Sequence, residues 1–80
     1  MKAHEKRLQI VLRELTAGPR TGSPEAAVVG RVSAKLGVAD YTVRTYLRTL
    51  ATRRWIEWRF GLVTITARGR EARTGRLEVE

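Results

Sequence analysis

The chain contains no cysteine, and its single histidine is His4. A disulfide framework, a zinc finger and a thiol nucleophile are therefore excluded, because the residues that build them are absent. No apolar run approaches the roughly 18 to 20 residues needed to span a bilayer, and the N-terminus lacks the apolar stretch of a signal peptide. We therefore expect a cytoplasmic protein that does not contact a membrane.

The residue groupings of an enzyme are also missing. No histidine lies near a serine or cysteine, no glycine-rich loop could cradle a phosphate, and no two carboxylates form a close pair. We therefore predict that the protein is not an enzyme and uses no cofactor, metal ion or small-molecule ligand.

Acidic residues are scarce: the 80 residues include 8 Asp and Glu against 16 Lys and Arg, for a net charge of +8. The imbalance is concentrated in residues 44–76, where the arginines are opposed only by Glu57 and Glu71. A polyanion-binding surface requires such a concentration of positive charge. The length and an apolar fraction of 42% fit one domain over residues 1–80, with residues 75–80 as a flexible or pairing tail.

Apolar residues at helical spacing predict a first helix from Ala3 to Leu15. Its stripe consists of Leu8, Val11, Leu12 and Leu15. A cluster of chain-breaking residues follows, made up of Gly18, Pro19, Gly22 and Pro24. Because glycine and proline at this density interrupt a helix, we expect a loop or a short edge strand here.

A second helix is predicted to begin in Ser23-Pro24-Glu25 and to end at Gly37. Serine is suited to cap the free backbone amides, proline suits the first helical position, and glutamate complements the positive end of the helix dipole. Glycine supplies the left-handed conformation that commonly ends a helix. The expected apolar stripe is Ala26, Val29, Val32 and Leu36.

The third helix is predicted to span Asp40 to Thr52, with Asp40 as its N-cap. The expected apolar stripe is Val43, Tyr46, Leu47 and Leu50. The rest of this helix has no acidic residue after Asp40, whereas exposed helix faces usually carry both signs of charge. Two short helices joined by a turn of a few residues are the arrangement that lays a second helix across the DNA major groove.

Beyond Arg53 the apolar period changes from helical to alternating. The strand that begins there would have Ile56, Trp58 and Phe60 on one face and Trp55, Glu57 and Arg59 on the other. A second run, Leu62 to Thr66, follows Gly61, so the two runs predict a hairpin. Its second strand would point Val63 and Ile65 toward the helices.

A short final helix is predicted from Ala67 to Arg73, with Thr66 as its cap and Gly75 at its end. The two tryptophans of the hairpin could stack on unpaired bases. On a hairpin packed against three helices, however, tryptophans more often belong to the core or its rim.

The candidate base contacts on the third helix are Tyr41, Thr42, Arg44, Thr45 and Arg48. Arg44 and Arg48 are four residues apart, so they project from the same side and are able to fork onto guanine O6 and N7. Arg53, Arg54 and Arg59 are expected to meet phosphates beside the groove or to reach into the minor groove. The alternative for each of these residues is an ordinary solvated position.

The order helix, helix, turn, helix, hairpin resembles that of the winged-helix transcriptional regulators, including the MarR and PadR groups. The likeness is carried by Leu36-Gly37-Val38, by residues 42–50 (TVRTYLRTL) and by residues 65–71 (ITARGRE), which are similar to the family's L-T-x-x-G-R-E ending. It implies an α+β winged helix-turn-helix fold, in which a three-helix core carries a C-terminal hairpin wing and a short final helix. The family also implies a homodimer.

The chain departs from this family in three respects. Arg54 stands where such domains usually have glycine between the third helix and the wing. The wing is short, with Gly61 near its tip and Arg59 as its closest charge. The dimerising helices of larger members have no counterpart, so the first helix or the tail would have to supply the contact between subunits.

We therefore expect a sequence-specific binder of double-stranded DNA, and specifically a nucleoid-associated transcriptional regulator that represses by occupying a promoter. Residues 40–52 would enter the major groove. Two alternatives remain open. One is a winged-helix interaction module for RNA or an acidic protein, since the fold alone does not fix the partner. The other is an architectural or replication-associated DNA binder with little sequence preference.

Overall fold

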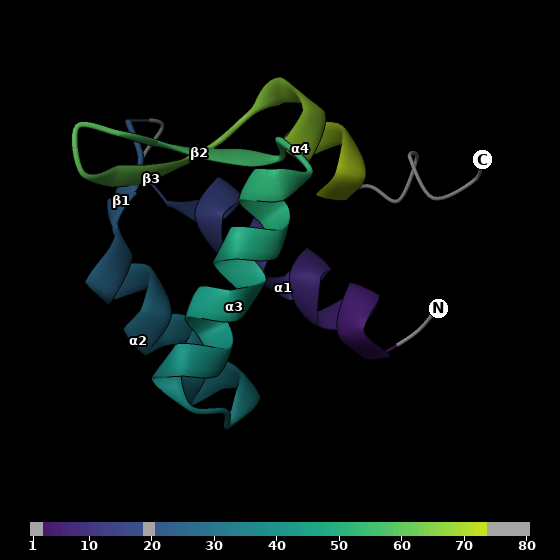
Figure 1. Cartoon of the computed structure of the whole chain (residues 1–80), viewed down its shortest axis with the longest axis vertical. Helices are drawn as coiled ribbons and strands as arrows, with labels where there is room; N and C mark the ends of the chain where they lie inside the picture. The colour runs from purple at the N-terminus through teal and green to yellow at the C-terminus, as the bar shows by residue number, and fades with distance from the viewer. Residues whose placement is uncertain (1–2, 19–20, 74–80) are drawn as a thin grey trace.

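The computed structural model describes residues 3–18 and 21–73 as a small α+β domain (Figure 1). The helices within these ranges are α1 (Ala3–Ala17), α2 (Glu25–Leu36), α3 (Asp40–Thr52) and α4 (Ala67–Arg73). The strands are β1 (Ser23–Pro24), β2 (Ile56–Arg59) and β3 (Leu62–Ile65), and they form one antiparallel sheet in the order β1-β3-β2. This confirms the α+β class and the predicted order of elements. The predicted helix end at Gly75 and the tail at 75–80 lie outside the described residues.

The core lies where α1, α2 and α3 pack together beneath the sheet. The stripes predicted for α1 and α3 are confirmed, because all eight of their residues are buried. The stripe predicted for α2 is wrong at its first position, where Ala26 is exposed. The helix begins at Glu25, and Val28, Val29 and Val32 are the side chains that it buries in the core.

A short edge strand, one of the two predicted alternatives, directly precedes α2 and includes Pro24. Ser23 pairs with Val63 of β3 and Pro24 pairs with Leu62. The prediction that Ser23 caps α2 is therefore wrong, because its side chain is buried in the sheet and Pro24 stands at the N-cap position without a side-chain hydrogen bond. Proline is tolerated here because an edge strand need not donate on its outer side.

The turn between α2 and α3 is short and has the predicted glycine. Gly37 adopts the left-handed conformation with φ of 67°, and its amide donates to the Ser33 carbonyl over 2.8 Å. α3 spans the predicted residues, but the predicted N-cap is wrong. Ala39 holds that position, and Asp40 lies one residue inside, in the first turn, where a carboxylate complements the helix dipole without bonding a free amide.

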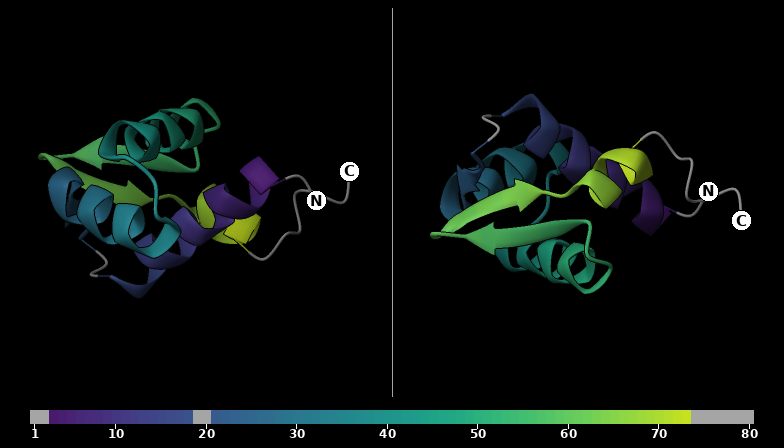
Figure 2. Two further views of the ribbon diagram at one scale, coloured as in Figure 1. Left: turned by 90° about the horizontal axis from the view of Figure 1, so that it is seen from below. Right: turned by 90° about the horizontal axis from the view of Figure 1, so that it is seen from above.

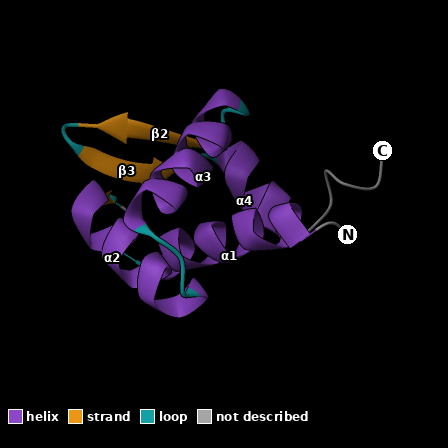
Figure 3. Cartoon of the chain, turned by 60° about the horizontal axis from the view of Figure 1, so that its bottom comes forward, coloured by secondary structure: helices purple, strands orange, loops and turns teal. Residues whose placement is uncertain are grey.

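The hairpin joins β2 to β3 through a two-residue turn. Arg59 pairs with Leu62, which leaves Phe60 and Gly61 in the turn with φ of 52° and 77°. The predicted placement of Phe60 on the strand face of Ile56 is therefore wrong, because the strand ends at Arg59. Figures 2 and 3 show the turn at the edge of the molecule opposite α4.

The base of the hairpin is packed against α4. Trp55 is buried, and its carbonyl accepts a hydrogen bond from the Thr66 amide over 2.9 Å. Thr66 caps α4 as predicted, since its Oγ1 accepts from the Gly69 amide over 3.0 Å. The same hydroxyl donates to the Arg54 carbonyl over 2.7 Å. One threonine therefore joins the end of α3, the start of β2 and the start of α4.

Candidate nucleic-acid interface

The exposed face of α3 carries most of the residues predicted to contact DNA. Tyr41, Arg44, Thr45 and Arg48 are exposed, whereas Thr42 is half-buried. Tyr41 is 74% exposed although it is aromatic, so folding gives it little packing. Past Asp40 this helix carries no acidic side chain, as its sequence already shows.

Three of the four threonines of α3 direct their hydroxyl protons back into the helix. Thr45 donates to the Tyr41 carbonyl, Thr49 to the Thr45 carbonyl and Thr52 to the Arg48 carbonyl, over 3.0 to 3.1 Å. Hydroxyls bonded in this way are not free to donate elsewhere. What these side chains offer to a ligand is therefore their methyl groups and hydroxyl lone pairs.

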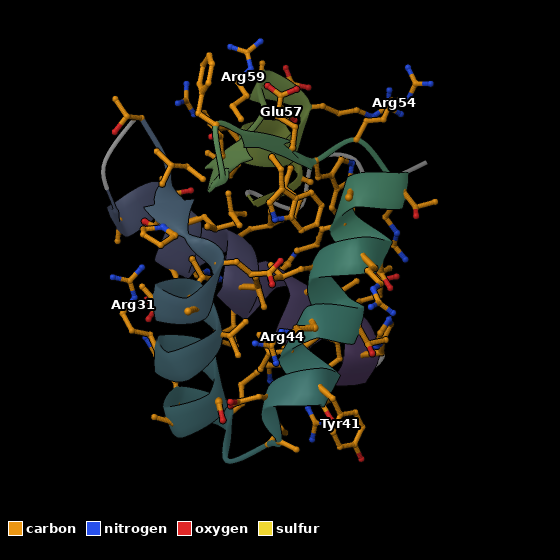
Figure 4. All side chains as sticks on the ribbon, turned by 60° about the vertical axis from the view of Figure 1, so that its left-hand side comes forward. Arg31, Tyr41, Arg44, Arg54, Glu57 and Arg59 are labelled. Atoms are coloured by element: carbon orange, nitrogen blue, oxygen red, sulfur yellow. The ribbon has the colours of Figure 1, made fainter. Side chains whose placement is uncertain are left out.

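Figure 4 shows α2 and α3 side by side with the hairpin above them. In this view Arg54 stands beside the C-terminal end of α3, Arg59 lies on the hairpin, and Arg31 projects from the side of α2 that faces away from α3. All three are exposed. Arg31 is not among the predicted DNA contacts, because a position off the apolar stripe of its helix predicts only an exposed side chain.

The side chains of Arg31, Arg48 and Arg54 form no hydrogen bond or ion pair with any residue in the described ranges. A guanidinium in this state keeps all five donors hydrated and ready to meet a phosphate or a base edge. These three arginines are therefore the cations of the face that an anionic ligand would reach without breaking a contact within the protein.

Glu25 places one negative charge within this face. Its Oε1 accepts from Trp58 Nε1 over 3.1 Å, and its Oε2 lies 3.5 Å from Arg44 Nε. The first turn of α2 is thus connected to both β2 and α3. Arg44 must leave Glu25, or share it, before its guanidinium can fork onto a base.

Arg53 does not belong to this face. It forms a bidentate pair with Glu5 of α1, with distances of 2.7 and 2.8 Å, and its guanidinium lies 4.9 Å from the centre of the Trp55 ring. Its sequence neighbour Arg54 points elsewhere, because Arg54 adopts a positive φ of 63° that turns the chain. Two adjacent arginines predicted to act together are therefore separated, and Arg53 joins α3 to α1.

The hairpin contributes Arg59, whose Nε lies 3.0 Å from Glu57 Oε1. Both side chains are largely exposed, so water screens this pair and it holds Arg59 only weakly. Of the tryptophans, Trp55 belongs to the core, which confirms the expectation for this residue. Trp58 is 41% exposed and donates from its Nε1 to Glu25.

We define the basic face by exposed residues of α2, α3 and the hairpin. Figure 4 labels five of them, Arg31, Tyr41, Arg44, Arg54 and Arg59, and helical spacing places the exposed Thr45 and Arg48 beside Tyr41 and Arg44 on α3. Within residues 3–18 and 21–73 there is no cluster of metal-binding side chains and no helix with the length and apolarity to cross a membrane. No family model, curated protein or solved structure matches this chain.

Proposed function

We propose that this chain is a winged-helix domain that binds double-stranded DNA sequence-specifically and represses transcription by occupying a promoter. The observation that carries the proposal is the basic face. It combines an exposed helix that has no acid after its first residue with a projecting hairpin and three arginines that have no partner among the described residues. Binding to a polyanion requires a surface with an excess of positive charge, and on this face the arginines outnumber the acidic side chains of Glu25 and Glu57.

Each part of the basic face has a distinct role in this proposal. α2, the turn at Gly37 and α3 form the helix-turn-helix, and α3 lies in the major groove with its early residues at base edges. Arg44 and Arg48 contact guanine, and the methyl group of Thr45 contacts a thymine methyl. The arginines of the neighbouring elements, Arg31, Arg54 and Arg59, contact phosphates and fix the orientation of the domain.

The first test is duplex binding as a function of salt. Each phosphate contact releases condensed counterions, so the three phosphate contacts of Arg31, Arg54 and Arg59 predict a slope of about −2.7 for log K against log salt. Absence of duplex binding at low salt would sink the proposal. Tighter binding to RNA or to an acidic polypeptide than to duplex DNA would favour the interaction-module alternative instead.

The second test separates base contacts from phosphate contacts. Arg48→Ala is expected to cost about 1 to 3 kcal/mol on a preferred site and to relax base preference, whereas Arg59→Ala weakens binding to all duplexes alike. Preferred sites come from selection among random duplexes, and palindromic sites would support a homodimer. Equal losses for both variants on every sequence would show a binder without sequence preference.

A further inference from the structure

Phe60 occupies the turn of the hairpin and is 100% exposed, the most exposed large apolar residue that the structure describes. It is the first residue of a two-residue turn and has a φ of 52°. Turns with positive φ at both central positions strongly favour Asn-Gly or Asp-Gly, because a bulky side chain is strained there. Both the exposure and the conformation of Phe60 therefore oppose folding, and a role outside folding would explain its presence.

We propose that Phe60 is a wedge that enters the minor groove of duplex DNA, inserts between two base pairs and kinks the helix. The wedge rests on the proposed function, because it requires α3 to lie in the major groove, with the hairpin turn at the adjacent minor groove. One helical turn of DNA is about 34 Å long and contains one major and one minor groove, so adjacent grooves lie about half that distance apart. The domain extends 33 Å along its longest axis and is therefore long enough to contact both.

The hairpin turn has the shape and surroundings that a minor-groove wedge needs. The turn is only two residues wide, and the minor groove is about 6 Å wide. Apolar side chains that partly unstack a base step in this groove kink DNA by about 20 to 90°. Arg59 precedes Phe60 in the chain and is exposed, so a cation accompanies the ring toward the phosphates.

A protein partner fits this turn less well than DNA does. One phenylalanine buries about 150 to 250 Å², whereas a stable protein interface buries about 800 Å² on each partner. The hairpin residues Glu57 and Arg59 are charged and exposed. Trp58 is the other exposed aromatic of the hairpin, but it is 41% exposed and its indole donates to Glu25, so the apolar surface around Phe60 stays small. A single ring on a narrow, partly charged turn is suited to insertion rather than to docking.

The test measures bending and affinity on one probe, a duplex of about 30 base pairs with mixed sequence and a central TA step, since such steps kink easily. Dyes at the two ends report bending by energy transfer, and 2-aminopurine beside the TA step reports unstacking. The variants are Phe60→Asn, which removes the ring and suits the turn, and Phe60→Leu, which keeps an apolar wedge. Thermal melting of each variant shows that it is folded.

We expect the wild type to kink the probe by at least about 20° and to raise the 2-aminopurine fluorescence. Phe60→Asn should abolish both signals and lower affinity about tenfold, while its melting temperature stays equal or rises. Phe60→Leu should retain most of the kink.

Two outcomes would overturn the wedge while the proposed function stands: the wild type binds the probe without bending it, or Phe60→Asn bends it as the wild type does. A Phe60→Asn variant that bends normally but changes its oligomeric state would place the ring in a protein interface instead. Failure of the wild type to bind the probe at all would overturn the proposed function itself.

Discussion

The two ends of the β2–β3 hairpin carry the same local conformation in opposite surroundings. At the base, Arg54 has a φ of 63°, and at the tip Phe60 has a φ of 52°, although neither is glycine. The Arg54 carbonyl accepts a hydrogen bond from the Thr66 hydroxyl, and the next residue in the chain, Trp55, is buried. Phe60, in contrast, is fully exposed. Backbone strain at the base is therefore offset by packing, whereas strain at the tip has no compensating contact in the domain.

The base of the hairpin is therefore fixed in the domain, whereas the tip is exposed to a ligand. The base sets the direction in which the hairpin leaves α3, because Thr66 and Gly69 hold it against α4. The tip lies at the edge of the molecule (Figure 2), and because its Phe60 side chain is fully exposed, it contributes little to stability. Substitutions at the base should therefore change the stability of the domain, and those toward the tip should change binding.

The largest effect is expected at Gly69. A Cβ at this position would overlap the Trp55 carbonyl oxygen and would lie 2.8 Å from Ile65 Cγ1, so α4 could not keep its place against the hairpin. Gly69→Ala should lower the free energy of unfolding by about 3 kcal/mol, measured by urea denaturation. A loss of this size is a large part of the total free energy of unfolding expected for a domain of this length.

Gly30→Ala is the matched control for Gly69→Ala. Gly30 also lies within a helix, but nothing lies within 4 Å of the position a Cβ would take. Alanine there should stabilise the domain by about 0.5 to 1 kcal/mol, because it restricts the unfolded chain and favours the helix. If both variants were equally stable, the close packing of α4 on the hairpin base would be wrong.

The next effect is expected at Thr66. Thr66→Val keeps the shape of the side chain but removes the hydroxyl that donates to the Arg54 carbonyl and accepts from the Gly69 amide. The expected loss of unfolding free energy is about 1 to 2 kcal/mol, and Thr66→Ser, which keeps the hydroxyl, should recover most of it. Similar unfolding curves for the valine and serine variants would show that the hydroxyl is not what holds the base.

Most of the fold was predictable because its signals are local and repeated. The stripes of α1 and α3 repeat several times at helical spacing, α2 ends at Gly37 in the left-handed conformation, and Pro24 lies in an edge strand directly before α2. The caps were predicted less well. Ser23 and Asp40 are residue types that commonly cap helices. However, Ser23 pairs with β3 in the sheet, and the N-cap of α3 is Ala39, so Asp40 lies inside the first turn.

The candidate site was predictable only where one helix supplies it. The exposed face of α3 follows from its own periodicity, whereas the separation of Arg53 from Arg54 depends on Glu5, which lies 48 residues away from Arg53. The proximity of Glu25 to Arg44 likewise depends on how α2 packs against α3. Sequence spacing within one element carries no information on such contacts.

A smaller effect on stability is expected at Arg54. Arg54→Gly should stabilise the domain by about 0.5 kcal/mol, because relief of about 1 kcal/mol of strain is partly offset by the greater freedom of glycine in the unfolded chain. Arg54→Ala keeps the strain, so its stability should match the wild type. Both variants should bind duplex DNA equally more weakly than the wild type, because both lack the guanidinium. If Arg54→Gly bound duplex DNA as tightly as the wild type, Arg54 would not contribute to binding on the basic face.

The smallest effect on stability, with the clearest effect on binding, is expected at Glu25. Glu25→Gln keeps an acceptor for Trp58 Nε1 but removes the charge that lies 3.5 Å from Arg44. Both partners are exposed, so the free energy of unfolding should change by less than about 0.5 kcal/mol. Duplex affinity should rise about threefold to tenfold at low salt, because Arg44 is released and a negative charge leaves the basic face, and the gain should shrink as salt rises.

Glu14→Gln separates this local effect from the change in net charge. Glu14 forms an exposed pair with Lys35 at 3.5 Å and is not part of the basic face, yet its substitution changes the net charge by the same amount. If DNA binds to the basic face, Glu25→Gln should strengthen binding more than Glu14→Gln does. Equal gains would mean that the ligand senses only the total charge of the domain, and the base contact assigned to Arg44 would have to be abandoned.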